Sequence, residues 1–523
     1  MTDDIYNKND QTNNYPNNVQ NAQYFAYAQP VPQRQKREFS ASERAAAFVS
    51  FIAAFLFFRF CVCETTGFVT TAVFILINTA AIVYMKKKGC KFSASSGAAA
   101  ALIYIFSTVY FITDNGFIKF LNTVFLILMG VFMVYTLGSS AENQKFPRFF
   151  PLVMLQAALS YPLEHFGRQP EAVVRSVKKG RLGGNIGFVI IGIVIAVPLT
   201  LVVGSLLMSA DSGVEDMLAG IADFIASEEM FALIWQLIIS VPIACYIFGM
   251  IYANTHRDRE KDITEDGCER ALSRSRLVQN ITVYTAVTPI CLLYILYMVS
   301  QAQYLMSAFS GTLPDGYSYA EYARRGFFEL LAIVVINLVV VILINLLAKN
   351  GGENKPAALK LYSTAICFFT LVIIASALSK MAMYISVYGL TELRVFTGWF
   401  MALCAFIFLF IIIKQFGKRL PLAKCVMVTF IAMFALLAFG RPDYVIGVYN
   451  IEMSRAGKLE EYDCEYLLSL SDDAVQAYLE YGCDDGTVTE WYMEKLQNEY
   501  RKDAFKLTNI SSIIVNNKIA DKY

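Results

Sequence analysis

Apolar stretches of about twenty residues recur along most of the chain, and they restrict the fold more than any other feature of the sequence. Lipid offers backbone N–H and C=O groups no partner, so a stretch that crosses a bilayer has to be helical. Arg59 interrupts the first stretch and small residues open the third, so ten spans are the alternative to eleven. The eleven stretches are residues 45–63, 66–85, 96–112, 120–138, 186–209, 230–254, 278–306, 326–348, 360–379, 397–415 and 421–440. The sequence therefore predicts an all-α, polytopic transmembrane helix bundle of about eleven spans.

The composition excludes the common classes of soluble protein. Hydrophobic residues make up 56% of the chain and charged residues 17%, whereas about 25% of a typical soluble domain is charged. The formal net charge is +1, so the chain has no basic field that would attract nucleic acid. We therefore expect the lipid bilayer to be its main partner and expect no nucleic-acid partner.

The positions of Lys and Arg predict the orientation of the spans, because these residues in short loops resist translocation. With eleven spans, the loops on one side hold 28 Lys and Arg, and the alternate loops hold six. The six are Arg59, Lys119, Arg324, Arg325, Lys380 and Arg394. The basic side is then cytoplasmic. This predicts a multi-pass protein of the plasma (inner) membrane with a cytoplasmic N-terminus and an extracytoplasmic C-terminus.

Two segments flank the transmembrane domain of residues 45–440. Residues 1–40 are rich in Asn, Gln, Tyr and Pro, and we expect a disordered cytoplasmic tail because so few aliphatic residues cannot offset chain entropy. Residues 441–523 hold nine basic and sixteen acidic residues, and we expect a small, mainly helical, extracytoplasmic C-terminal unit. Ser471 predicts the N-cap of a helix that runs through Glu480. Protein partners, if the chain has any, are expected at these two segments.

The sequence contains no motif that would name a catalytic residue. It has no P-loop, no G-x-S-x-G elbow and no G-x-G-x-x-G turn. His165 and His256 stand in different loops without a partner at metal-ligand spacing. We therefore predict no catalytic residue, cofactor or metal, and an enzyme is the least favoured class. A disulfide between Cys464 and Cys483 is allowed, because both are predicted to lie outside the cytoplasm, but many such segments stay reduced, so the pairing is left open.

Charged residues at the ends of two spans form the most specific candidate for a binding site, because charge at the membrane is costly. In a helix, Glu321, Arg325 and Glu329 would share one face, with Arg324 three residues from Glu321. Consecutive arginines are suited to grip an anionic group. The site would face outward and bind an anionic headgroup, a cell-wall precursor or a peptide. Its predicted residues are Tyr319, Glu321, Tyr322, Arg324, Arg325, Glu329, Glu392, Arg394, Asp443 and Asn450.

Two other functions fit the same sequence. If the charged groups only lock helix ends together through ion pairs, the protein is a membrane scaffold or a signalling-associated protein whose terminal segments recruit partners. Pro198, Pro242 and Pro289 bend three spans, which is common in transporters and also in membrane helices generally. A transporter predicts a water-filled cavity between the fifth and eighth spans.

Several motifs resemble a known family. They are GIVIAVPL (192–199) followed by SAD (209–211), QYL (303–305) followed by YAEYARRGFFEL (319–330), YGLTELR (388–394), and YNI (449–451) with YLLSLS (466–471). Over residues 50–480 the chain resembles the bacterial polytopic membrane proteins of domain of unknown function 4173, which are related to type 4153. The resemblance implies a multi-span bacterial membrane protein. It implies no activity, substrate, cofactor or catalytic residue.

Overall fold

The computed structural model describes eleven continuous ranges of the chain and a few isolated residues between 196 and 210. The ranges are 38–63, 67–138, 149–179, 228–256, 265–300, 327–349, 355–417, 420–459, 464–482, 490–494 and 509–520. The chain divides into two units, Met1–Ser40 and Ala41–Tyr523. The predicted disordered tail makes up the first unit and lies almost entirely outside the described residues.

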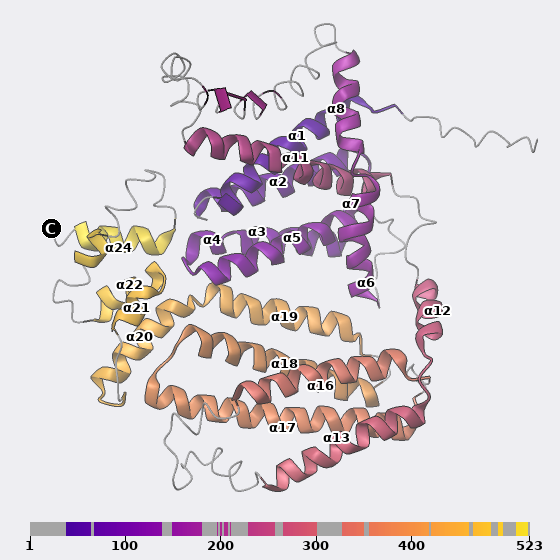
Figure 1. Ribbon diagram of the computed structural model, residues 1–523, viewed down its shortest axis with the longest axis vertical. Coiled ribbons are helices and arrows are strands. Elements are labelled where there is room, and N and C mark those ends of the chain that lie inside the picture. Colours follow the sequence, from indigo (N-terminus) through magenta and orange to yellow (C-terminus); the bar gives the residue numbers. More distant parts are fainter. Residues whose placement is uncertain are drawn as a thin grey trace, which may run out of the picture. The chain divides into compact units, whose positions relative to one another are not determined.

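Ten helices in the described part of the second unit are long and apolar enough to cross a membrane. They are α1 with its π-helical end η1 (Ala41–Phe58, Arg59–Cys63), α2 (Phe68–Lys87), α3 with α4 (Ala94–Ser107, Val109–Ile112), α5 (Gly116–Gly138), α11 (Glu228–Thr255), α13 (Asn280–Ser300), α16 (Phe327–Leu347), α17 (Ala357–Tyr388), α18 (Glu392–Phe416) and α19 (Leu422–Phe439). Figure 1 shows most of them running in roughly the same direction. They match ten of the eleven predicted spans, and the predicted span at 186–209 lies outside the described residues. The all-α polytopic bundle is confirmed.

The first and third spans, which the sequence left open, are both helical. Arg59 is tolerated at the end of the first span, where its guanidinium lies 5.6 Å from the centroid of the Phe60 ring. The third span begins after Ser93, whose hydroxyl accepts the N–H of Ser96 in a capping box. α17 is longer than predicted and reaches Tyr388, so Lys380 is a buried helical residue rather than part of a loop.

Helices α1 to α5, α11 and α19 pack around one apolar core. Aromatic rings fill its centre: Phe106 of α3 stacks on Phe434 of α19, with 5.6 Å between ring centroids, and contacts Phe125 of α5 at 4.6 Å. The short helices α6 (Phe150–Leu155), η3 (Gln156–Ser160) and α7 (Tyr161–Glu164) lie beside this core, and α8 (Arg168–Lys179) packs on α1 and α11. The apolar run that begins at Phe149 therefore packs against neighbouring helices.

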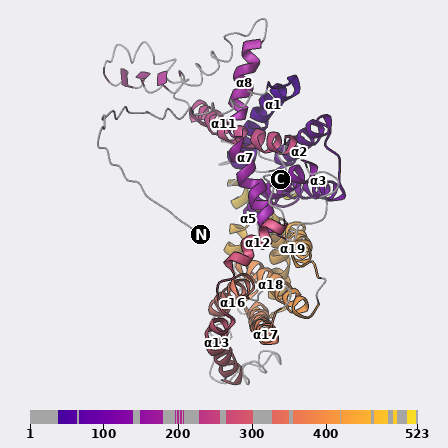
Figure 2. The same cartoon turned by 90° about the vertical axis from the view of Figure 1, so that its right-hand side faces the viewer.

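Helices α13, α16, α17 and α18 form a second core. A chain of hydrogen bonds ties three of them together: the Tyr294 hydroxyl donates to Asn337 Oδ1 at 2.6 Å, and Asn337 Nδ2 donates to Thr370 Oγ1 at 2.9 Å. α19 packs on both α18 and α5 and so joins the two groups. Figure 2 looks nearly along α17, α18 and α19 and shows α19 beside α18. The described residues contain no strand, apart from a single bridge between Val278 and Ala348.

The chain after α19 forms a small helical unit with a core of its own. Its helices are α20 (Pro442–Arg455), α21 (Cys464–Ser469), α22 (Asp472–Tyr481) and α24 (Ile510–Ala520). Ile446, Val475 and Val515 are fully buried in this core. Figure 1 shows these helices gathered at one end of the long helices. The described residues after Arg441 are mainly helical as predicted, and α22 begins directly after Ser471 as predicted.

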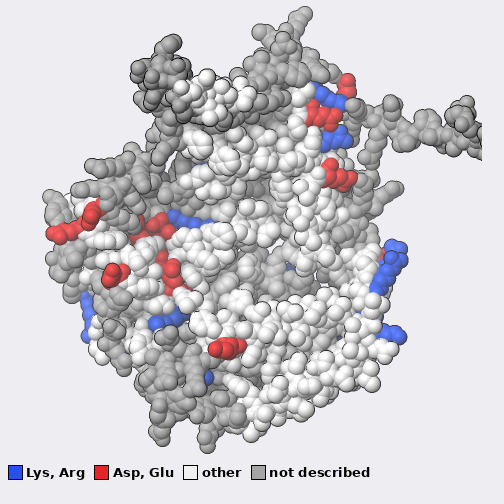
Figure 3. Space-filling model, viewed as in Figure 1, with Lys and Arg blue, Asp and Glu red and all other residues white. Residues whose placement is uncertain are grey.

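Contacts at the helix ends sort the loops into two sets. At one end, Glu43 of α1 accepts from Lys88 at 2.7 Å and from His256 at 3.0 Å, which follow α2 and α11. At the other end, the loop of residues 113–115 bonds to Glu392 at the start of α18 and to Asp473 of the C-terminal unit, and the Glu392 N–H donates to the Tyr466 hydroxyl. Loop charge predicted the same two sets, and the cytoplasmic position of the Glu43 end stays a prediction. Figure 3 shows acidic side chains over the C-terminal helices and a broad, mostly uncharged band beside them.

Candidate functional site

Three distant parts of the chain meet through polar side chains at one end of the long helices. They are the loop of residues 113–115, the start of α18, and the C-terminal helices α20, α22 and α24. We call this contact region the junction, and its residues are Thr113, Asp114, Asn115, Glu392, Arg441, Asp443, Ser471, Asp473 and Ser511. Most of these side chains are buried, so each hydrogen bond between them matters for stability.

Asn115 links two carboxylates. It precedes α5, and its Oδ1 accepts the N–H of Ile118 at 2.9 Å, which is the geometry of an N-cap. That bond fixes the amide group so that Nδ2 donates to Glu392 Oε1 at 2.5 Å and to Asp443 Oδ2 at 2.9 Å. A neutral amide therefore bridges an acidic residue of α18 and an acidic residue of α20.

Asp443 is 1% exposed, and its closest hydrogen-bond donors are neutral groups. The Ser471 hydroxyl donates to its Oδ2 at 2.5 Å, and Asn115 donates to both carboxylate oxygens. Burial raises the pKa of Asp443 to about 6; the hydrogen bonds oppose this shift, and the nearby Glu392 and Asp473 carboxylates add to it. Asp443 therefore changes its protonation close to neutral pH.

Asp473 holds four segments together with one carboxylate. Its Oδ1 accepts from Arg441 Nη2 at 2.9 Å and from the Ser511 hydroxyl. Its Oδ2 accepts from the Thr113 hydroxyl at 2.5 Å and from the Asp114 N–H at 3.1 Å. The side chain is fully buried and lies in the first turn of α22, where the helix dipole also favours a negative charge. Donors from Arg441, Ser511, Thr113 and Asp114 thus stabilise the charge of Asp473.

Arg441 reaches four partners from a backbone conformation that is rare outside glycine: Asp473, Gln476, Ser511 and the ring of Tyr444. Its φ is 46°, in the left-handed region, and Pro442 follows at the first position of α20. Besides Asp473, its Nη2 donates to Gln476 Oε1 at 2.6 Å, and its guanidinium lies 4.9 Å from the centroid of the Tyr444 ring. The left-handed conformation at Arg441 therefore directs its side chain toward α22.

Two further acidic residues, Asp114 and Asp472, form hydrogen bonds near the starts of α22 and α24. Asp114 accepts from Lys119 Nζ at 2.8 Å and from Asn509 Nδ2 at 2.8 Å, and burial raises its pKa. Asp472 accepts from the Tyr492 hydroxyl at 3.0 Å and from the Ser512 hydroxyl at 2.5 Å. These bonds extend the junction to the last helix of the chain.

Asn450 brackets the loop after α17. Its Oδ1 accepts the N–H of Leu390 at 2.7 Å, and its Nδ2 donates to the C=O of the same residue at 2.9 Å. Gly389 lies directly beneath, because a Cβ at that position would stand 2.5 Å from Asn450 Oδ1. Its φ of +73° also favours glycine. This close approach positions α20 against the loop that joins α17 to α18.

Arg394 closes the C-terminal end of α17. Its Nη1 donates to the Tyr388 C=O at 2.9 Å and to the Gly389 C=O, and its guanidinium lies 4.1 Å from the centroid of the Tyr384 ring. A basic group at the end of a helix satisfies carbonyls that have no partner within the helix and interacts favourably with the dipole. The contacts of Arg394 thus fix the orientation of α18 relative to α17.

The structure separates the predicted site residues into three sets. Glu392 and Asp443 meet at the amide of Asn115, and Arg394 and Asn450 hold the neighbouring loop. Glu329 is an exposed residue in the first turn of α16 and makes none of the junction contacts found among the described residues. The other five, Tyr319, Glu321, Tyr322, Arg324 and Arg325, lie outside the described residues, as does the Cys464–Cys483 pairing.

Sequence reasoning missed Thr113, Asn115, Arg441 and Asp473, and it assigned Ser471 only a capping role. The Ser471 hydroxyl does not cap α22; it donates to Asp443 instead. The turn Thr113-Asp114-Asn115 did carry a signal. Its three consecutive polar residues stand between two apolar stretches, so their hydrogen-bond partners had to come from elsewhere in the chain. The spacing along the chain gave no indication of which partners they find. Within the described residues, no group of three or more His, Cys, Asp or Glu has metal-binding geometry.

The fold and the junction define a polytopic α-helical membrane protein whose C-terminal helices are docked on one end of its spans. The family characterised by a domain of unknown function (DUF4153) matches residues 100–481, and the chain belongs to this family. The match begins in α3 and ends with the last residue of α22, so it includes both sides of the Asn115 contacts and, except for Ser511, of the Asp473 contacts. Comparisons with curated proteins and with solved structures gave no significant match.

Proposed function

We propose that this chain is a scaffold of the bacterial plasma membrane, whose spans hold an acidic helical unit at the extracytoplasmic face for protein partners. The junction is the observation that supports this most directly. Glu392, Asp443 and Asn450 each direct polar atoms to another segment of the chain, and Arg394 does so across the α17–α18 loop. Contacts of this kind fix one part of a protein on another and leave less of each side chain for a small ligand.

The proposed orientation rests on loop charge. Lys86, Lys87 and Lys88 end α2 at the opposite end of the helices from the junction, where Glu43 and His256 also lie. Translocating such a run of lysines is unfavourable, so the lysine end would stay in the cytoplasm. The C-terminal unit would then stand outside the cell.

The charge of the C-terminal unit supports a basic partner. Residues 441–523 hold sixteen acidic and nine basic residues. Acidic side chains gather over these helices in Figure 3. Complementary charge raises the association rate and disfavours wrong partners. A protein with a basic surface is therefore the partner class that this unit would select.

Cysteine labelling tests the orientation. In a background in which Cys63, Cys464 and Cys483 are replaced by Ser, Lys458→Cys in the C-terminal unit and Lys87→Cys at the end of α2 each add one exposed thiol. A membrane-impermeant maleimide should label Lys458→Cys in intact cells and Lys87→Cys only after the membrane is permeabilised. The opposite pattern would contradict the proposal.

In-cell crosslinking tests the scaffold. A photoreactive amino acid is placed at Tyr481 or Met493, which are exposed in the C-terminal unit. A scaffold predicts a discrete crosslinked protein, and capture should fall when Asp473→Ala loosens the unit. Lys518→Gln, which removes only an exposed ion pair with Glu480, is the matched control. Absence of a discrete product, or equal capture with Asp473→Ala, would argue against scaffolding.

A site for an anionic headgroup, cell-wall precursor or peptide is the second candidate. Glu329 favours it, because this residue of the predicted Glu321, Arg325 and Glu329 face is exposed and takes no part in the junction contacts among the described residues. The double variant Arg324→Gln, Arg325→Gln should then reduce the thermal shift that short-chain phosphatidylglycerol produces in the purified protein. An unchanged shift would remove this candidate. Transport stays a prediction, because its proposed cavity involves the fifth span, which lies outside the described residues.

A further inference from the structure

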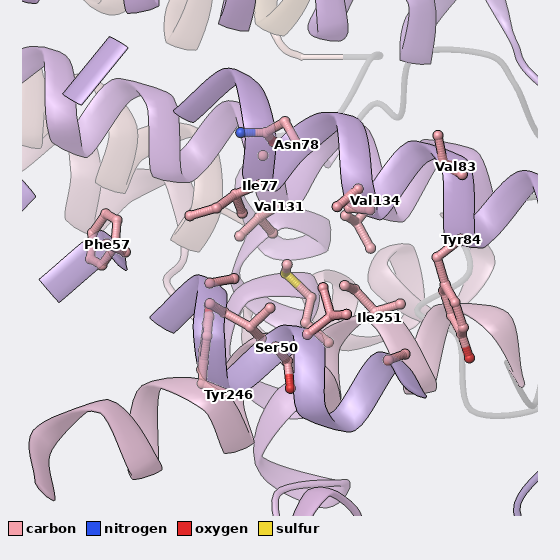
Figure 4. Close-up of a pocket in the computed structure, with 18 of the residues that line it drawn as sticks. Ser50, Phe57, Ile77, Asn78, Val83, Tyr84, Val131, Val134, Tyr246 and Ile251 are labelled. Carbon is pink, nitrogen blue, oxygen red and sulfur yellow. The ribbon is translucent and has the colours of Figure 1, made fainter. Parts of the chain in front are cut away.

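A large cavity lies between α1, α2, α5 and α11, away from the junction. Its volume is about 530 Å³. The cavity exists because small residues face it from three of the four helices: Ala45, Ala46, Ala53, Ala80, Ala81 and Gly130. Figure 4 shows larger apolar side chains, such as Val131, Val134 and Ile251, pointing into the remaining space. Pockets of this size, with mainly apolar linings, are typical of ligand sites.

The cavity is long and runs along the helices. Its lining on α1 extends from Ser42 to Phe57, and on α2 from Phe74 to Lys87. At 1.5 Å per residue, the α1 lining spans about 22 Å, more than half of a hydrocarbon core about 30 Å thick. This shape suits an extended alkyl chain better than a compact molecule.

The cavity opens sideways toward the surroundings of the helices. Val49 of α1 and Val83 of α2 both line it, and they are 48% and 46% exposed. Both residues lie within candidate membrane spans, so this opening would face lipid. A bilayer lipid could enter it without crossing water.

Few polar groups reach the interior. Asn78 is 8% exposed, and its Nδ2 donates back to the Phe74 C=O at 2.9 Å. The Ser50 hydroxyl donates to the Ala47 C=O at 2.9 Å. Side chains that satisfy themselves on their own helix leave an apolar wall, which favours hydrocarbon over water or a polar solute.

One end of the cavity is basic. Lys87 lines it and is exposed, and the adjacent Lys86 is exposed as well. The buried Glu43 carboxylate nearby is already paired with Lys88 and His256. Lysines at the membrane surface attract anionic lipid headgroups. The charge at this end therefore complements a phosphate and would repel a cationic headgroup.

From these observations we propose that the cavity binds one acyl chain of an anionic phospholipid, with its phosphate at Lys86 and Lys87. The apolar walls take the chain, the opening along Val49 and Val83 admits it from the bilayer, and the lysines hold the headgroup at the interface. This inference concerns a cavity that lies away from the junction, and it does not rest on the proposed scaffold.

Photocrosslinking of the full-length protein in proteoliposomes tests the proposal. The probe is phosphatidylglycerol with a diazirine near the methyl end of one acyl chain. It should form adducts near Phe57 and Phe74, at the deep end of the cavity. The pair Ala80→Phe, Gly130→Leu should reduce these adducts about tenfold or more, because filling the cavity displaces several buried CH₂ groups. Ala72→Phe, at an exposed position of α2, should leave them unchanged.

Lys87→Gln provides a test that does not disturb packing, because this side chain is exposed. It should lower phosphatidylglycerol adducts about fivefold, the effect of one lysine at an anionic surface. Adducts of phosphatidylcholine carrying the same acyl chain should not change. Adducts spread over the lipid-facing residues of all spans and unaffected by Ala80→Phe, Gly130→Leu would overturn the proposal. Equal labelling by both lipids, with no effect of Lys87→Gln, would overturn the assignment to an anionic lipid.

Discussion

Asn450 holds Leu390 by both ends of its side-chain amide, accepting the backbone N–H at 2.7 Å and donating to the backbone C=O at 2.9 Å. The pair imitates the bonds that one strand makes to another, although it joins a helix to a loop. It satisfies two backbone groups at the turn between two spans. This contact therefore couples the placement of α20 to the way in which α17 and α18 are connected.

Gly389→Ala should loosen this contact. The new Cβ would stand 2.5 Å from Asn450 Oδ1, and alanine disfavours the φ of +73°. We expect a loss of about 1–3 kcal/mol in the docking of the C-terminal unit, measured as protection from limited proteolysis. Gly457→Ala isolates the effect of φ, because that glycine has a φ of +63° with nothing within 4 Å of an added Cβ. Equal losses in both variants would show that the Asn450 contact is unimportant.

Asn115→Asp should weaken docking more than Asn115→Ser does. Aspartate and serine both keep an acceptor for the Ile118 N–H, and both lose the amide donor to Glu392 and Asp443. Loss of a donor to buried carboxylates costs about 1–3 kcal/mol, and a third negative charge adds to that cost. Thermal unfolding in detergent at pH 8 measures the difference. Because protonation removes the added repulsion, the two variants should converge as the pH falls; identical stability at pH 8 would contradict this assignment.

Asp473→Ala should be the most disruptive single change in the C-terminal unit. It removes the partner of Arg441 and leaves the donors of Thr113 and Ser511 unsatisfied. Removing one partner of a buried ion pair typically costs about 3–5 kcal/mol, and the 20% exposure of Arg441 places the loss at the lower end. Lys518→Gln should cost under about 1 kcal/mol, because its pair with Glu480 is solvent-exposed. The measurement is protease protection of the unit, and similar losses for both variants would refute the ranking.

Docking of the C-terminal unit should strengthen as the pH falls from 8 to 5. A carboxyl group that has a pKa of about 6 when docked, and an ordinary pKa when undocked, binds its proton more tightly in the docked state. Its contribution is complete below about pH 4 and is lost as the pH rises through about 6. The full change, which is reached only below about pH 4, is about 3 kcal/mol, and about half of it falls between pH 8 and pH 5.

Asp443→Asn provides the control for this pH dependence. It should flatten most of the dependence, with a remainder from Asp114, whose pKa is raised by burial in the same direction. Protease protection measured between pH 5 and pH 8 tests both variants. Stronger docking at pH 8 than at pH 5 in the unsubstituted protein would contradict the assignment.

The spans were predictable because each needs only local hydrophobicity and length, which the sequence carries in one continuous stretch. The third span shows how small residues suffice once Ser93 caps the helix. The grouping of loops into two sets was predictable for a similar reason, since lysines mark one end regardless of how the helices pack.

The junction could not be predicted in the same way. Asn115 and Asp443 are 328 residues apart, and their contact depends on how two groups of helices pack around α19. Glu392 and Asp443 were predicted to matter because their charge can be recognised in the sequence. The neutral Asn115 between them has no charge by which it could have been recognised. The residue Ser471 was placed correctly at the start of α22, but its hydroxyl responds to a buried carboxylate that only the tertiary structure supplies.

Only Gly440 and Arg441 separate the end of α19 from the start of α20, and Arg441 is clamped by Asp473 and Gln476. The connection between α19 and α20 is therefore short and held in one conformation. A tilt or rotation of α19 caused by tension or thickness changes in the bilayer would be transmitted to the C-terminal helices as torque. The position of the C-terminal helices is thus tied to the orientation of α19.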